Sequence, residues 1–157
     1  RQAANYELET RQGPMVCRTD LAPSPDFRLV SEVVTEGLDG PDVAIGISIT
    51  NDLTQDVLDH LRRSSSSYGA VLLLRPDRPF GSTALRSPED MVALAESVKQ
   101  ISQRFVRERR AQHLGLFYLG PFAGALFIGH RLNAVARAIQ VFEDAAPGYA
   151  PSFLLQE

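Results

Sequence analysis

The chain has 157 residues, of which 44% are hydrophobic and 22% charged, and its formal net charge at pH 7 is −3. This length and composition predict one soluble globular domain with a core of its own. The slight acidity argues against non-specific binding of duplex nucleic acid. The single cysteine, Cys17, excludes an internal disulfide framework and a multi-cysteine metal site. A lone thiol fits the cytoplasm, where we place the protein.

No membrane segment or secretion signal is expected. The longest apolar run, residues 114–129, is shorter than the about 20 residues that span a bilayer, and Pro121 interrupts it. The chain starts with the polar stretch "RQAANYELET" rather than a signal peptide. It also lacks a starting Met, which suggests a fragment of a longer protein.

Residues 1–42 read as a strand-rich segment, either the remnant of a preceding unit or a linker to an effector. The stretches "NYELE" at 5–9 and "FRLVSEVV" at 27–34 are the expected strands. Turn-forming residues fill 18–26 between them and 36–42 after them.

From residue 43 to 157, apolar strands alternate with helical patterns. The strands are continuously apolar, which is typical of a parallel sheet covered on both faces. We therefore predict an α/β fold with a Rossmann-like, mostly parallel sheet and helices on both of its faces. A last extended segment, 149–155, contains Pro151 and is expected at an edge. The expected inner strands are 43–49, 70–74, 113–119 and 138–142, and the helices start near residues 53, 88 and 121.

The stretch "GPFAGALFIGHRLN" at 120–133 has three glycines but does not match a nucleotide-cofactor motif. Gly124 and Gly129 have the spacing of a phosphate loop, yet His130 and Arg131 stand where that motif needs Lys and Ser or Thr. The spacing G-x-G-x-x-G is also absent. We interpret the stretch as a strand-to-helix turn in which Pro121 starts the helix and the glycines allow close packing on the sheet. Its bare helix N-terminus is a candidate anion site.

Four loops are expected to meet at the carboxyl ends of the strands: 50–52, 75–77, 120–123 and 143–144. Ligands bind at this edge in open α/β sheets. The hydroxyl, amide, carboxylate, guanidinium and aromatic groups of these loops suit recognition of a base and a phosphate. They suit catalysis badly, since no nucleophile motif and no metal-spaced histidine pair is present. Thr50 or Asn51 can also cap the following helix, with Asp52 at its positive end.

Three ordered stretches together resemble the SAVED family: "VAIGISITNDLTQDVLDHL", "HLGLFYLGPFAGALFIGHRLN" and "IQVFED" followed by "GYAPSFLL". The resemblance covers residues 43–155. It implies a sensor domain of bacterial antiphage defence built from two units of the CRISPR-associated Rossmann (CARF) fold. Because 157 residues are short for two such units, the chain looks like the C-terminal unit with part of the first. The resemblance also implies a ligand pocket that draws on both units.

The resemblance implies binding of a cyclic di- or trinucleotide, with no metal or other cofactor. Ligand binding would drive oligomerisation and switch on an effector, such as a nuclease, a TIR domain or a protease, in the same or an associated chain (CBASS systems). Arg75 would contact a phosphate, residues 120–123 would contact a base or phosphate through the backbone, and Phe142 and Tyr149 would stack on bases. Core packing remains an alternative for Phe122 and Phe142. The expected ligand-binding residues are Thr50, Asn51, Asp52, Arg75, Gly120, Pro121, Phe122, Ala123, Phe142, Glu143 and Tyr149.

Two other functions remain open. The protein could be a ring nuclease that cuts such signals with Asp52, Asp77 or His113 as acid or base. It could also be a structural module that only oligomerises an effector. A binding sensor without catalytic residues is the leading hypothesis.

Overall fold

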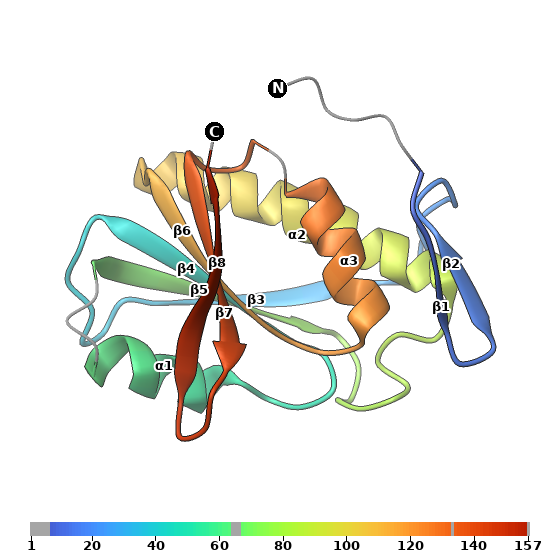
Figure 1. Cartoon of the computed structure of the whole chain (residues 1–157), viewed down its shortest axis with the longest axis horizontal. Helices are drawn as coiled ribbons and strands as arrows, with labels where there is room; N and C mark the ends of the chain where they lie inside the picture. Colours follow the sequence, from blue (N-terminus) through green and yellow to red (C-terminus); the bar gives the residue numbers. More distant parts are fainter. Residues whose placement is uncertain (1–6, 64–66, 133, 157) are drawn as a thin grey trace.

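The computed structural model describes residues 7–63, 67–132 and 134–156, which form an α/β fold. The fold is built on one six-stranded sheet with a small two-stranded sheet beside it (Figure 1). In chain order the elements are β1 (Glu9–Gln12), β2 (Met15–Arg18), β3 (Leu29–Val34), β4 (Asp42–Ser48), α1 (Thr54–Arg63), β5 (Tyr68–Pro76), α2 (Pro88–Arg109), β6 (His113–Leu119), α3 (Phe122–Arg131), β7 (Ala138–Asp144) and β8 (Tyr149–Gln156).

The main sheet is mixed, with strand order β3-β5-β4-β6-β7-β8. The four inner strands run parallel to one another, as their continuous apolar sequences predicted. Both edge strands are antiparallel to their neighbours. The expected α/β class is confirmed, but a mostly parallel sheet describes only the inner strands. The position of β8 at an edge agrees with Pro151 in its sequence, because proline has no N–H to donate to a ladder.

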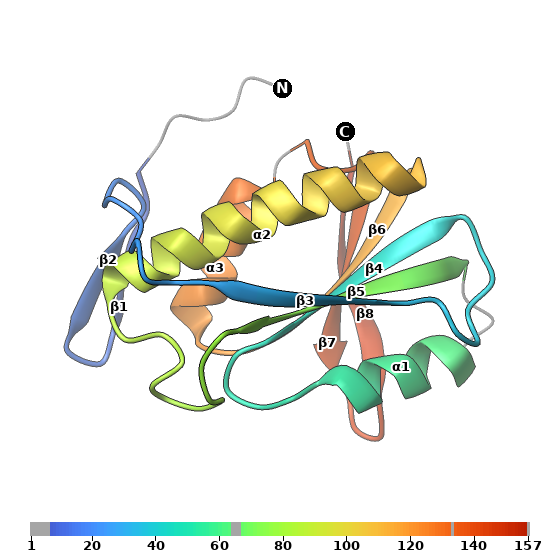
Figure 2. The same cartoon turned by 180° about the vertical axis from the view of Figure 1, so that it is seen from behind.

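Helices cover both faces of the sheet, as expected (Figures 1 and 2). Helix α1 packs on one face, where Leu53, Val57 and Leu61 join a buried cluster with Phe117. Helices α2 and α3 pack on the other face and contribute to the larger cluster. Within the described residues, no helix is both long and apolar enough to cross a membrane.

The N-terminal segment contributes to both sheets. The strands β1 and β2 form an antiparallel hairpin beside α2 and α3 (Figure 1). The first strand begins at Glu9 rather than at residue 5, and residues 1–6 lie outside the described part of the chain. The expected strand at 27–34 is confirmed as β3, and it pairs with β5 as an edge of the main sheet.

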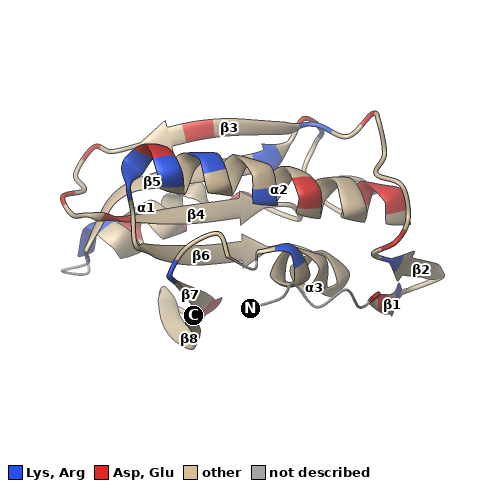
Figure 3. Cartoon of the chain, turned by 90° about the horizontal axis from the view of Figure 1, so that it is seen from above, with Lys and Arg blue, Asp and Glu red and all other residues tan. Residues whose placement is uncertain are grey.

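Helix α2 begins as its sequence predicted. The Ser87 hydroxyl caps it by accepting a hydrogen bond from the Asp90 amide at 3.2 Å, and Pro88 follows at the first helical position. Acidic residues lie in the first turn and basic residues in the last, an arrangement that complements the helix dipole. Figure 3 shows this separation, with red at the start of α2 and blue near its end.

A buried ion pair fixes the loop between β5 and α2. The side chains of Arg78 and Asp90, 12% and 3% exposed, meet at 2.5 Å. Asp90 also accepts a hydrogen bond from the Arg86 amide at 2.8 Å, and the Arg78 guanidinium lies over the Phe27 ring. Burial alone would raise the pKa of Asp90, but hydrogen bonds from Arg78, the Arg86 amide and Ser24 lower it below its ordinary value. This loop reaches the carboxyl edge of the sheet.

We expect Asp90→Asn to lower the free energy of unfolding at pH 7 by about 3 kcal/mol, because it leaves the buried Arg78 without its countercharge. Since the folded pKa of Asp90 is depressed, its contribution exists above the unfolded pKa of about 3.9 and is lost as the pH falls through the folded pKa. Urea denaturation from pH 7 to pH 3 measures both effects. The exposed Glu89→Gln variant is the control. Equal stability of the two variants at pH 7 would contradict the assignment.

Candidate functional site

The carboxyl ends of β4, β5 and β6 are tied together by backbone hydrogen bonds. The amides of Ile49 and Thr50 both donate to the Leu119 carbonyl, at 2.8 and 3.2 Å, and the Gly81 amide donates to the Ile49 carbonyl at 3.2 Å. From β4 the chain continues to β5 on one side, and β6 lies on the other. This is the point in an open α/β sheet where loops diverge and ligands bind. The structure therefore brings three of the four predicted loops together.

The Gly-Pro turn after β6 is organised by a tyrosine. The Tyr118 hydroxyl donates to the Pro121 carbonyl at 2.8 Å. A Cβ added at Gly120 would lie 2.6 Å from that hydroxyl and 2.8 Å from the Ile49 Cβ, and one at Gly124 would be closer still to the hydroxyl. Burial raises the pKa of Tyr118, so its hydroxyl stays protonated as the donor. These two glycines therefore make room for Tyr118 and the β4 loop.

Helix α3 starts without a side-chain cap, as predicted. Pro121 occupies the N-cap position, one residue earlier than expected, and no side chain accepts a bond from the first turn. The Phe122 ring is 72% exposed, so the alternative of core packing is wrong for this residue. Ala123 is 1% exposed, so neither its side chain nor its backbone is open to a ligand. The accessible part of the turn is the exposed Phe122, beside the half-buried Gly120 and Pro121.

The loop after β4 is exposed and ordered by its own side chains. Asn51 Oδ1 accepts from the Asp52 amide, and Asp52 Oδ1 accepts from the Thr54 amide, both at 2.9 Å. Asp52 therefore satisfies an amide at the start of α1, in keeping with its expected place at the positive end of this helix, whereas the Asn51 side chain does not cap the helix. Hydrogen bonds from the Thr54 hydroxyl and amide lower the pKa of Asp52, and the charge of Arg75 lowers it further.

A hollow of about 230 Å³ opens beside Arg75 on the face that carries α1. Sequence analysis expected Asp52 and Arg75 at the site but missed Phe80, which is 36% exposed in the β5–α2 loop. Its signal was an aromatic residue between proline and glycine in a loop of polar and turn-forming residues. The hollow is lined by Val30, Ser31, Glu32, Ser48, Asp52, Thr54, Leu73, Leu74, Arg75 and Phe80.

Phe142 and Tyr149 belong to an aromatic cluster under α1. The Phe142 ring stacks on the buried Phe117 ring with centroids 4.5 Å apart, and the Tyr149 ring meets Phe117 edge-on at 4.9 Å. The His60 ring on α1 contacts all three. These contacts support the packing interpretation for Phe142, whereas Glu143 is exposed at the end of β7.

Tyr149 also borders a second hollow of about 480 Å³ between α1 and the β7–β8 hairpin. Burial, together with the charges of Asp56 and Asp144, raises the pKa of Tyr149. The second hollow is lined by different residues from the one beside Arg75, and both border α1. The predicted residues therefore lie around three adjoining features of the α1 side and the carboxyl edge rather than in one pocket.

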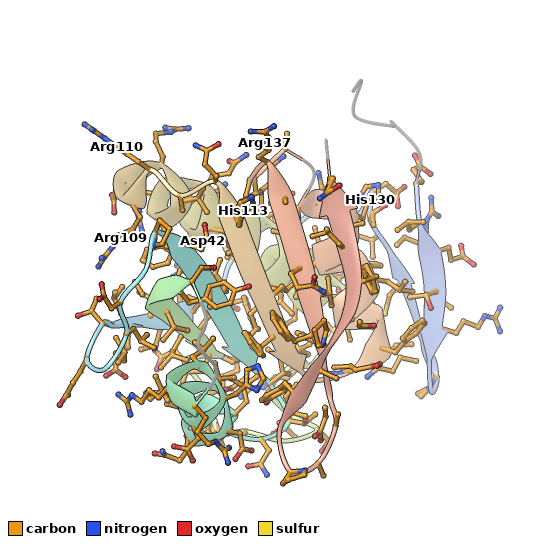
Figure 4. The ribbon with its side chains drawn as sticks, turned by 60° about the vertical axis from the view of Figure 1, so that its left-hand side comes forward. Asp42, Arg109, Arg110, His113, His130 and Arg137 are labelled. Atoms are coloured by element: carbon orange, nitrogen blue, oxygen red, sulfur yellow. The ribbon has the colours of Figure 1, made fainter. Side chains whose placement is uncertain are left out.

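One candidate acid or base lies at the opposite end of the sheet. His113 begins β6, and its Nδ1 meets Asp42 Oδ1 at 3.1 Å, where the Ser67 hydroxyl also donates to Asp42. Figure 4 shows His113 beside Asp42, while Arg110 and Arg137 extend away from them. His113 therefore cannot act together with Asp52 or Asp77. Among the described residues, no group of three or more His, Cys, Asp or Glu is arranged to hold a metal ion.

The parallel inner strands and their edge loops define an open-sheet α/β domain, and comparison with known families identifies it. Residues 5–155 match the model of SAVED, the "SMODS-associated and fused to various effectors sensor domain". The chain belongs to the SAVED family, as its sequence motifs indicated. A comparison with curated proteins finds no match.

Solved SAVED receptors share the fold. The Acinetobacter baumannii Cap4 SAVED/CARF-domain containing receptor with the cyclic trinucleotide 3'3'3'-cAAA matches with a TM-score of 0.78 and 21% identity, over 98% of this chain and 33% of that chain. The same receptor with 2'3'3'-cAAA gives 0.76 and 21%, over 98% and 33%. The Moraxella osloensis Cap4 receptor gives 0.65 and 20%, over 97% and 31%. The chain thus spans about a third of the length of these receptors.

Two alanine substitutions in α3 should have opposite effects. Gly124→Ala places a methyl group against the Tyr118 hydroxyl, and we expect it to destabilise the protein by about 1 kcal/mol or more. Gly129→Ala meets no atom within 4 Å, and we expect it to stabilise the helix by up to about 1 kcal/mol. Urea denaturation of both variants measures the difference. Stabilisation by Gly124→Ala would show that Tyr118 does not constrain this turn. The open space around Gly129 already shows that the expectation of close packing at this glycine is wrong.

Proposed function

We propose that this chain is a sensor unit that binds a cyclic di- or trinucleotide at the carboxyl edge of its inner strands. The observation that carries the proposal is the tie between the loops after β4 and β6 at the Leu119 carbonyl. It holds the polar loop 50–52 against the uncapped start of α3, so that side-chain and backbone donors face one edge. Such an edge suits a ligand that alternates phosphates with bases.

The matched receptors support the ligand class. Two of the Cap4 structures contain a cyclic trinucleotide, and the described fold of this chain superposes on both. We propose that the parallel β5-β4-β6-β7 centre is one Rossmann-like, CARF-like unit spanning residues 43–157. In this arrangement, the start of α3 contacts a phosphate, the exposed Phe122 ring stacks on a base, and Arg75 contacts the ligand from the hollow beside it.

Signalling would follow from assembly. The family description places SAVED sensors with various effectors. We propose that ligand binding drives oligomerisation of the protein in antiphage defence and thereby activates an effector in the same or an associated chain. Light scattering with and without ligand separates this mechanism from a module that assembles by itself.

A ring nuclease is the alternative, and the geometry gives it less support. Asp52 is engaged as the cap of α1, and His113 lies at the amino end of β6 with Asp42. Of the three candidate acids and bases, only Asp52 and Asp77 remain at the carboxyl edge.

The direct test is calorimetric titration of the protein with cyclic di-, tri- and tetra-adenylates and with rings that contain guanine. We expect saturable binding of at least one di- or trinucleotide ring, with chromatography of the same mixtures showing the ring intact. Linear products would favour the nuclease. If no ring binds, the proposed function is wrong.

Asn51→Ala should separate ligand binding from stability. Among the described residues, the Asn51 side chain hydrogen-bonds only to the neighbouring Asp52 amide and is exposed, so we expect a change in unfolding free energy within about 0.5 kcal/mol. Loss of its amide from the site should weaken ring binding about five-fold or more. The matched variant Asp52→Ala removes the α1 cap and should cost about 1 kcal/mol of stability. Unchanged affinity in Asn51→Ala would remove this residue from the site.

A further inference from the structure

The hollow beside Arg75 has the size of a subsite rather than of a complete ligand pocket. Its volume is about 230 Å³, below the about 300–1,000 Å³ of pockets that enclose a drug-sized ligand. Its base is apolar Leu73, and β3 and β5 supply neighbouring walls, because Glu32 pairs with Leu73 and Val30 with Arg75 in the antiparallel register. The Phe80 ring lines it from the β5–α2 loop. One base of a cyclic oligonucleotide fits these dimensions better than the whole ring.

The charged residues that line the hollow indicate whether it suits a base or a phosphate. Two carboxylates, Asp52 and Glu32, and one guanidinium, Arg75, border the hollow. With a net charge of −1, this lining disfavours a phosphate group and favours a neutral group with several N–H donors. The side chains of Glu32 and Arg75 have no hydrogen bond and no ion pair within 4 Å among residues 7–63, 67–132 and 134–156. Their acceptors and donors are therefore available to a ligand.

We propose that this hollow is a guanine-recognition subsite, which makes the ligand a cyclic oligonucleotide with at least one guanine. The inference rests on the proposed function and deepens it by naming a base. Guanine presents two adjacent donors, N1–H and the N2 amino group, and two adjacent acceptors, O6 and N7. Glu32 accepts from the donor pair, Arg75 donates to the acceptor pair, and Phe80 stacks on the base.

Adenine does not satisfy the same groups. It has one amino donor, and its unprotonated N1 would face the Glu32 carboxylate where guanine offers a hydrogen. Adenine also lacks O6, so Arg75 could donate to N7 but not to a second acceptor beside it. A buried polar group left without its partner is what makes such a subsite selective. A matched bidentate contact discriminates between bases by about 1–3 kcal/mol, which corresponds to about five-fold to 150-fold in affinity.

The test is calorimetric titration of the protein with three cyclic trinucleotides: all adenine, two adenines with one guanine, and two adenines with one inosine. We expect the guanine ring to bind about ten-fold or more tightly than the all-adenine ring. Inosine keeps N1–H and O6 but lacks the N2 amino group, so its ring should bind with intermediate affinity. Equal affinities, or tighter binding of the all-adenine ring, would overturn the guanine subsite and leave the proposed function standing. Binding of none of the rings would overturn both.

Two variants test whether the preference for guanine arises in this hollow. Glu32→Gln replaces one acceptor by an N–H donor that opposes guanine N1–H, so the guanine preference should fall to about three-fold or less while affinity for the all-adenine ring stays within about two-fold. Glu36→Gln, an exposed change of the same chemistry outside the hollow, should keep the full preference. A general loss of protein stability would lower the affinity for all of the rings by the same factor and leave the preference unchanged. An undiminished preference in Glu32→Gln would show that the base is read elsewhere.

Discussion

The Leu119 carbonyl is the point on which the candidate site depends. It accepts hydrogen bonds from two consecutive amides, those of Ile49 and Thr50, just after β4 ends. These bonds hold the β4 loop against the β6 loop at a place where any side chain on Gly120 would strike Ile49. The loops that diverge from the inner strands are thereby kept in contact instead of spreading over the sheet edge. Their polar groups can then face one ligand together.

Tyr118 extends this constraint into α3. Its hydroxyl reaches the Pro121 carbonyl through the space that Gly120 and Gly124 leave free. The helix start is thus positioned by the partly buried Tyr118 side chain beneath it, and no polar side chain caps its first amides. A cap would satisfy the same backbone donors that a phosphate needs. Positioning from below and an open end are compatible only because the glycines carry no side chain.

The sequence predicted the inner sheet well because its signal is local. Runs such as 43–49 and 113–119 are almost continuously apolar, with Ser48 and His113 as their polar members, and this pattern is typical of strands buried on both faces. The antiparallel direction of β3 and β8 was not predicted, since direction depends on pairing with strands far along the chain. The Gly-Pro turn was interpreted correctly as a strand-to-helix connection, but the partner that requires two of its glycines, Tyr118, was visible only in the fold.

The sequence predicted which loops meet at the carboxyl edge, but it predicted less well how their side chains are placed. Knowing which loops follow parallel strands was sufficient to select 50–52 and 120–123. It was not sufficient to separate Phe122, which is exposed, from Phe142, which stacks on Phe117. Phe122 follows β6 whereas Phe142 lies within β7, and their environments differ because Phe142 packs on Phe117 and His60 under α1 while Phe122 is exposed. Glu32 and Phe80 were missed for a related reason, since an antiparallel edge strand and a long loop bring them to the hollow from outside the parallel core.

The division of roles around α1 follows from these positions. One carboxylate oxygen of Asp52 accepts a hydrogen bond from the Thr54 amide, so a residue that borders the hollow also stabilises the start of α1. The side chains of Glu32 and Arg75 form no hydrogen bond or ion pair with other described residues. Both are exposed, and the pairing of β3 with β5 fixes the spacing between them. If Glu32 and Arg75 contact the ligand as proposed, this separation lets ligand-contacting residues differ between family members while the cap and the Leu119 bonds preserve the edge. Base preference within the family is then expected to vary at the β3–β5 wall, where change has the smallest effect on folding.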